Sequence, residues 1–116
     1  MFGWFRKKAT HPANDAVRQV LSEGGDDGTR VRHVIHFAYP LERANAVSKV
    51  AVKDCILSYV DVTFTETLDS EGVVFEHYRE VASAEFDTLT DTMKHALEDK
   101  GWTYDGWECA LETGAT

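Results

Sequence analysis

Cysteine and proline are scarce in this chain of 116 residues, which contains two of each. The cysteines, Cys55 and Cys109, are too few for the disulfide framework of a small secreted scaffold, and no CxxC motif or cysteine–histidine cluster indicates a zinc site. No apolar run approaches the roughly 20 residues of a membrane-spanning helix, and none of signal-peptide length follows the basic residues near the start. We therefore expect a cytoplasmic protein with reduced thiols, no metal and no cofactor.

Positive charge is scarce in the second half of the chain. Residues 1–60 contain nine Lys and Arg against six Asp and Glu, whereas residues 61–116 contain three against fourteen, a net charge of −11. Such a surface is repelled by the phosphates of nucleic acid, so we expect no direct nucleic-acid contact. It favours a basic protein partner through steering and complementary contacts. The alternative is that the acidity only keeps the protein soluble.

Composition and length divide the chain into three segments. Residues 1–11 form an arm in which three aromatic residues precede three basic ones, and we favour a mobile or self-docking terminus over a membrane contact. Residues 12–112 have the length of a single domain. Residues 113–116 form a short tail.

Hydrophobic periodicity and turn residues predict helices and strands in the domain. Apolar residues recur at helical spacing over 12–23, 41–58 and 83–100. Asn14 or Asp15 is expected to cap the first of these helices and Ser83 the last. Alternating, β-branched and aromatic residues predict strands over 29–39, 59–67, 73–81 and 102–111.

The order after the first helix is β-α-β-β-α-β, which predicts the split βαβ, or ferredoxin-like, α+β fold. In that arrangement two helices bury their apolar stripes against one face of a four-stranded antiparallel sheet. The other face is left to water or to a partner.

Alternation along the strands divides the side chains between the two faces of this sheet. The helix-facing set is predicted to contain Val31, Ile35, Phe37, Val60, Val62, Phe64, Val73, Phe75, Trp107, Cys109 and Leu111. The open face is predicted to carry Arg32, Val34, His36, Asp61, Thr63, Glu76, Tyr78, Glu80, Tyr104, Glu108 and Ala110. A bulge at Asp105–Gly106 would reverse the alternation on one side of it, because glycine inside a strand often marks one.

Aromatic residues and carboxylates are mixed on this open face, which suits the docking of a cationic peptide. The same face offers an alternative function as a small enzyme or metabolite-binding domain, because His36 near Glu76 or Glu108 would form a general acid–base pair. His33 and His77 are expected to form a hydrogen-bonded pair on the inner face. No nucleophile, phosphate-binding loop or metal motif is present, so we assign no catalytic residue.

One short motif carries a resemblance to a known family. The segment Tyr104-Asp105-Gly106-Trp107-Glu108 follows a helix that ends at Gly101, an Asp-Asp-Gly triplet at 26–28 precedes the first strand, and a Phe-Asp pair at 86–87 opens the last helix. Together these features resemble the domain family of the regulator of ribonuclease activity B (RraB), over roughly residues 14–112.

The resemblance implies a ferredoxin-like domain that is not an enzyme. Members of this family bind the endoribonuclease RNase E through its non-catalytic C-terminal region, which is rich in arginine, and inhibit RNA turnover. We therefore expect a basic or arginine-rich protein segment as the partner, and a third hypothesis is a self-associating domain. For Trp107, the alternative to partner binding is that its side chain fills the core. The expected partner-binding residues are Tyr104, Asp105, Trp107, Glu108, Glu76 and Tyr78.

Overall fold

The structure of the chain is a computed structural model that describes residues 11–41, 46–65 and 71–114. Apart from His11, the aromatic and basic arm lies outside the described residues. The elements in chain order are α1 (Pro12–Glu23), β1 (Arg32–Pro40), α2 (Lys49–Leu57), β2 (Thr63–Thr65), β3 (Val73–Arg79), α3 (Ala84–Glu98) and β4 (Trp102–Cys109). The strands form one sheet in the order β2-β3-β1-β4, and each neighbouring pair is antiparallel. The predicted α+β class is thereby confirmed.

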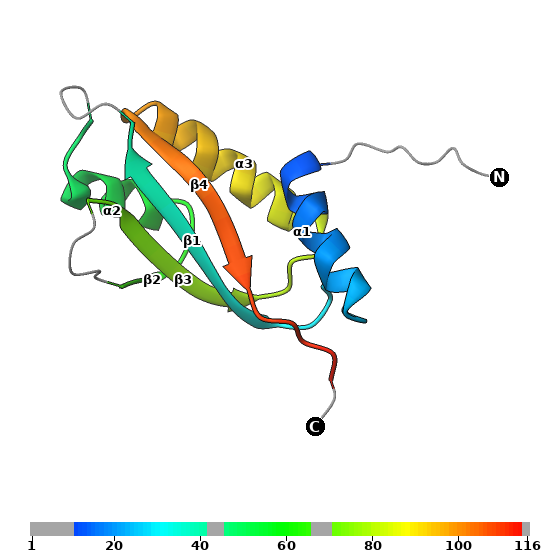
Figure 1. Cartoon of the computed structure of the whole chain (residues 1–116). Coiled ribbons are helices and arrows are strands. Elements are labelled where there is room, and N and C mark those ends of the chain that lie inside the picture. Colours follow the sequence, from blue (N-terminus) through cyan, green and yellow to red (C-terminus); the bar gives the residue numbers. More distant parts are fainter. Residues whose placement is uncertain (1–10, 42–45, 66–70, 115–116) are drawn as a thin grey trace.

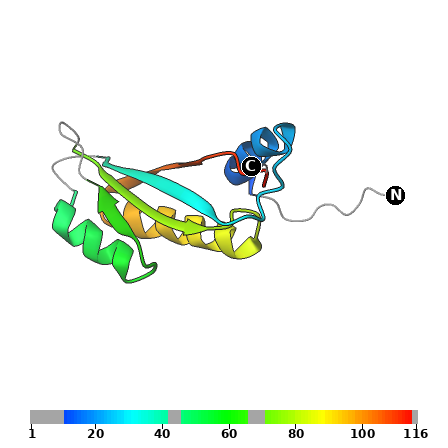
Figure 2. The same cartoon turned by 90° about the horizontal axis from the view of Figure 1, so that it is seen from below.

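Two of the helices cover one face of the sheet. Figure 2 shows α2 and α3 on the same side of the strands, whereas α1 stands beyond one end of the sheet. Helix α1 lies at one end of the sheet, beside the first half of α3 (Figure 1). The sheet therefore has one helix-covered face and one open face, as the sequence predicted.

The helices begin where a side chain accepts an otherwise free backbone N–H group. Ser83 caps α3 as predicted, and its Oγ accepts the N–H of Phe86 at 3.1 Å. Helix α1 has its predicted bounds, but its N-cap is His11, whose Nδ1 accepts the N–H of Asn14 at 3.2 Å. The prediction of Asn14 or Asp15 as the cap was wrong, because the Asn14 side chain is turned into the interior and bonded there.

Helix α2 is shorter than the helix predicted over 41–58, and Ser48 is its N-cap. The backbone before it is engaged elsewhere. The N–H groups of Leu41 and Val47 donate, at 2.9 and 3.0 Å, to carbonyl groups in the turn after α3. These bonds fasten the start of the segment to that turn, so the helix begins only at Lys49.

Strand β1 shows the reverse of the predicted alternation. Arg32, Val34 and His36 face the helices and are at most 2% exposed, whereas Ile35 and Phe37 lie half-buried on the open face. The prediction that Arg32, Val34 and His36 point outward was therefore wrong. An alternation of one polar and one apolar residue reveals two faces, but not which of them is buried.

A buried polar partner explains this orientation of β1. The Arg32 guanidinium forms an ion pair with Asp26, and both side chains are 0% exposed. Asp26 also accepts the backbone N–H groups of Gly28 at 2.9 Å and Glu112 at 2.8 Å. These bonds, the one from Arg32 above all, hold the pKa of Asp26 well below its usual range. Charges are tolerated in the interior when they are paired and hydrogen-bonded in this way.

Strand β4 contains the predicted bulge. While β1 advances two residues from His36 to Ala38, β4 covers three between their partners Trp107 and Tyr104. Gly106 has φ 101°, in the left-handed region that glycine tolerates. The bulge places both Tyr104 and Trp107 on the helix-facing side, where they join the core. The outward placement of Tyr104 was wrong for this reason, and the inward placement of Trp107 is confirmed.

The core has two parts. The larger cluster lies between the sheet and the helices α2 and α3 and contains Ala38, Val52, Ile56, Val73, Phe75, Met93, Leu97 and Trp102. The smaller cluster joins α1 to α3 and the sheet and contains Leu21, Val34, Val81, Phe86 and Trp107. Both cysteines are free thiols. None of the helices in the described ranges has the length and apolar character needed to cross a membrane.

Candidate functional site

Two carboxylates face outward from one row of the open face. Ile35 of β1 lies opposite Glu76 of β3 on one side and opposite Glu108 of β4 on the other. Thr63 of β2 lies opposite Glu76 and extends the row. Because neighbouring strands lie about 4.8 Å apart, the two glutamates stand roughly 10 Å apart with an isoleucine between them.

An aromatic residue stands in the next row. Tyr78 is 72% exposed, and its ring stacks on that of His33 with centroids 4.9 Å apart. His33 Nε2 lies 2.5 Å from Glu76 Oε1, and the Thr65 hydroxyl donates to the other carboxylate oxygen. The Thr65 bond first, and then His33, lowers the pKa of Glu76, so this carboxylate is ionised at neutral pH.

A third carboxylate, that of Asp105, lies on β4 near Glu108, at the edge of the sheet. Asp105 and Glu108 are exposed, and neither carboxylate bonds to a described residue. With Glu76, Tyr78 and Ile35 they form a surface that we call the acidic face. Four of the predicted partner-binding residues, Asp105, Glu108, Glu76 and Tyr78, are thus brought together. His33 was missed because the predicted alternation of β1 placed it inside.

The other two predicted partner-binding residues point the opposite way. Trp107 is 9% exposed, and its Nε1 donates to Asn14 Oδ1 at 2.7 Å. The Tyr104 hydroxyl lies 2.7 Å from His36 Nδ1, and burial raises the pKa of this phenol. Neither side chain belongs to the acidic face, so the core alternative for Trp107 is the one that the structure bears out.

A pair of buried histidines lies on the helix-facing side of the sheet. His36 is 1% exposed, and its Nε2 is hydrogen-bonded to His77 Nε2 at 2.9 Å. Burial, and then the charges of His77 and Arg79, lower the pKa of His36 to about 3. Burial and the nearby Arg79 lower that of His77 to about 4. Both rings are neutral at pH 7, and together with Tyr104 they form a chain of hydrogen bonds in the interior.

This placement corrects two predictions about histidines. His36 does not meet Glu76 or Glu108, because it projects from the opposite side of the sheet; the histidine beside Glu76 is His33. His77 is paired with His36, and not with His33. The acid–base pair predicted at His36 is therefore absent from the described structure.

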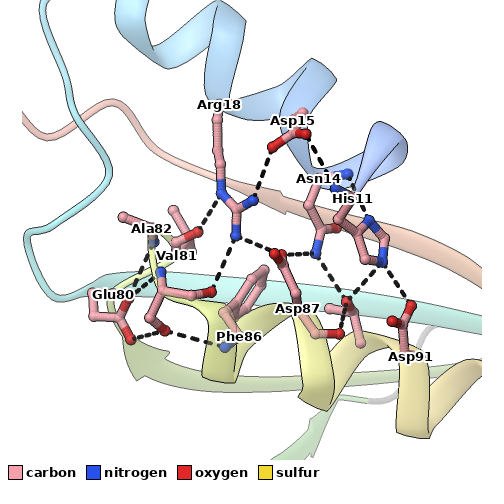
Figure 3. Close-up of polar contacts among 12 residues, drawn as sticks. His11, Asn14, Asp15, Arg18, Glu80, Val81, Ala82, Phe86, Asp87 and Asp91 are labelled. Atoms are coloured by element: carbon pink, nitrogen blue, oxygen red, sulfur yellow. Dashed lines mark hydrogen bonds and ion pairs between the residues drawn. The ribbon is translucent and has the colours of Figure 1, made fainter. Parts of the chain in front are cut away.

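A third polar cluster fastens α1 to the rest of the molecule (Figure 3). Arg18 Nε donates to the carbonyl of Val81 at 2.8 Å, and its Nη2 donates to Asp87 Oδ1 at 2.6 Å. Its remaining bonds reach Asp15 at 3.1 Å and the carbonyl of Ser83 at 3.3 Å. The bonds from Arg18 and Asn14 lower the pKa of Asp87 although burial opposes them.

Asn14 is the buried centre of this cluster. It is 1% exposed, and its Nδ2 donates to Asp87 Oδ1 and to Thr90 Oγ1, both at 2.9 Å. Its Oδ1 accepts the indole N–H of Trp107. One side chain therefore connects α1, α3 and β4, and a polar residue in an amphipathic helix gave no sign of this from the sequence.

No group of three or more His, Cys, Asp or Glu residues within the described ranges is arranged to hold a metal ion. Comparison of the chain with models of known protein families, with curated proteins and with solved structures found no match.

Proposed function

We propose that this chain is a non-enzymatic, cytoplasmic regulator that docks its acidic face on a basic, arginine-rich segment of a ribonuclease such as RNase E. The observation that carries the proposal is the acidic face itself. It combines the carboxylates of Asp105, Glu76 and Glu108 with an exposed tyrosine on a side of the sheet that no described helix covers.

The proposed topology is the ferredoxin-like split βαβ, and the antiparallel order β2-β3-β1-β4 supports it.

The charges on the acidic face are available to a partner. Asp105 and Glu108 have no bonding partner among the described residues, and Glu76 shares only a histidine and a hydroxyl. A cation brought to this face therefore gains attraction without breaking an existing pair with lysine or arginine. The net charge of −8 adds long-range steering toward a basic segment.

Arginine suits this face better than lysine. Tyr78 stacks on His33 with one side of its ring, and its 72% exposure leaves aromatic surface on which a guanidinium can stack. The adjacent Glu76 accepts the planar fork of the same group, whereas a lysine ammonium offers a point charge only. An arginine-rich segment combines both contacts.

Binding of a labelled arginine-rich peptide from the C-terminal region of RNase E tests the proposal by fluorescence anisotropy. The double variant Asp105→Asn/Glu108→Gln should bind about tenfold more weakly, because two partly exposed ion pairs of up to about 1 kcal/mol each are lost. The matched control Glu85→Gln/Glu98→Gln removes two exposed charges from α3 and should change the affinity less than about twofold.

A peptide with lysine at every arginine position should bind more weakly than the arginine peptide. Equal weakening by the two double variants would show that the peptide senses only net charge, and would refute the acidic face as the docking site. Absence of binding at low salt would refute the proposed partner class.

A further inference from the structure

A pocket of ≈ 480 Å³ opens where α1, α3 and the bulge of β4 meet. His11 and Asn14 line it from α1 and its cap, Asp91 and Lys94 from α3, and residues 104–107 from β4. Pockets of about 300 to 1,000 Å³ are typical of sites for small ligands or single anchoring side chains. It shares Asp105 with the acidic face, so the two surfaces are continuous around the edge of the sheet.

The walls of this pocket are held in place before any ligand binds. The Asn14 side chain is fixed by bonds to Asp87 and Thr90 and by the indole N–H of Trp107. Figure 3 shows Asn14 beside His11 and Asp91, and the ring nitrogen Nε2 of His11 lies 2.7 Å from Oδ1 of Asp91. A preorganised wall lowers the entropy cost of binding.

The bulge shapes the remaining wall. A Cβ atom added at Gly106 would meet nothing within 4 Å, so the backbone there borders open space. The extra residue of a bulge bends its strand and changes the direction of neighbouring side chains. Here it brings the aromatic residues Tyr104 and Trp107 into the wall and leaves the Asp105 carboxylate at the rim.

The charges around the pocket favour a cation. Asp91 and Asp105 contribute two carboxylates, against one ammonium from Lys94. Asp91 is already engaged by His11, whereas Asp105 has no partner among the described residues. The free carboxylate beside aromatic walls is complementary to a guanidinium group. A guanidinium stacks on aromatic surfaces and is weakly hydrated, so its desolvation costs little free energy.

We infer that this pocket takes one arginine side chain of the partner segment, with its guanidinium at Asp105 and its stem against Tyr104 and Trp107. The identity of the arginine as part of a partner protein rests on the proposed function, but the pocket itself is tested with an isolated side chain. Lys94 opposes the bound cation, so its removal strengthens binding.

The test titrates the whole chain with arginine blocked at both ends as N-acetyl-arginine N-methylamide, and follows ¹H–¹⁵N NMR spectra. Saturable shifts are expected at the Asp105 and Gly106 amides and at the Trp107 indole N–H, with a Kd on the order of 1 mM for a single side chain. The citrulline analogue, which is neutral and nearly the same shape, should produce no saturable shift at these signals.

Three variants make the test specific. Asp105→Asn should weaken binding about threefold, as expected for one partly exposed ion pair, and Lys94→Gln should strengthen it by a similar factor. Glu98→Gln, which removes an exposed charge of α3 outside the pocket, should leave the affinity unchanged. Spectra of the unliganded variants that differ from the wild type only near the substitution confirm that each is folded.

The outcomes separate this inference from the proposed function. Shifts confined to Tyr78, Glu76 and Glu108 would refute binding in the pocket and would still support the acidic face as the docking site. Equal binding of the citrulline and arginine compounds would also refute the pocket as an arginine site. If the chain binds arginine in the pocket but does not bind the arginine-rich peptide, the pocket is supported and the proposed partner is refuted.

Discussion

Acidification should destabilise this protein well before its carboxylates titrate. His36 and His77 have folded-state pKa values of about 3 and about 4, against an ordinary value of 6.5. As the pH falls below 6.5, these two histidines therefore bind protons in the unfolded chain but not in the folded chain. The stability contributed by the two neutral rings is fully present above that pH, and is lost as the pH falls toward the folded-state values.

The size of the loss follows from the linkage relation. Each group contributes up to about 1.4 kcal/mol per pH unit, so between pH 6.5 and 4.5 the fully buried His36 alone costs about 2.3 kcal/mol. His77 is partly exposed and contributes less, which gives a total of about 3 to 5 kcal/mol. A small domain has only about 5 to 15 kcal/mol of stability, so it should be close to unfolding near pH 4.5. The buried carboxylates, whose pKa values are lowered, act only at still lower pH.

Urea unfolding monitored by tryptophan fluorescence at pH 7.0, 6.0, 5.0 and 4.5 measures this loss. His77→Gln keeps a hydrogen-bonding side chain but does not titrate, so its stability should fall less steeply over the same range. His95→Gln removes an exposed histidine of α3 and should leave the slope unchanged. A wild-type stability that is constant between pH 6.5 and 4.5 would show that the histidine pair is not held neutral by burial.

Three further predictions concern stability, each measured by the midpoint of chemical or thermal unfolding. Asn14→Ala should cost about 2 to 3 kcal/mol, because it leaves the buried indole N–H of Trp107 without an acceptor; a loss below about 0.5 kcal/mol would contradict the role of Asn14 as the buried centre. Gly106→Ala should cost about 1 to 2 kcal/mol through its positive φ alone, since its Cβ would meet no atom, and an unchanged stability would argue against the bulge geometry. Arg32→Met should cost about 3 to 5 kcal/mol by leaving Asp26 charged and unpaired, whereas the double variant Arg32→Met/Asp26→Leu should recover part of that loss; additive costs would contradict a buried pair.

The elements were predictable where a local signal marked their ends. The first helix has the predicted bounds, and Ser83 and Gly101 mark the ends of α3, because a capping hydroxyl and a left-handed glycine act within one turn of the chain. The start of α2 was not predictable, because backbone bonds to a turn more than 50 residues away decide it. Of the two aromatic rings that line the pocket, Trp107 was predicted to face inward, whereas Tyr104 was predicted to face outward because the effect of the bulge on its side of the strand was not known.

The candidate site was predictable on β3, and not on β1. Glu76 and Tyr78 were placed correctly on the open face, since Val73 and Phe75 project from the opposite side of that strand and are at most 3% exposed. On β1, Val34 and Ile35 stand next to each other and either of them suits the core. The choice was made by Asp26, which meets Arg32 only in the folded chain.

By itself the sequence determined the order of helices and strands, the bulge at the glycine of β4 and the excess of negative charge in the second half, because each of these depends on neighbouring residues or on composition. The tertiary structure decided which side of β1 and β4 is buried, and therefore which carboxylates and aromatic rings share a surface. Burial is a property of contacts between distant segments, and polar residues such as Arg32, His36 and Asn14 enter the interior only where those segments supply their bonding partners.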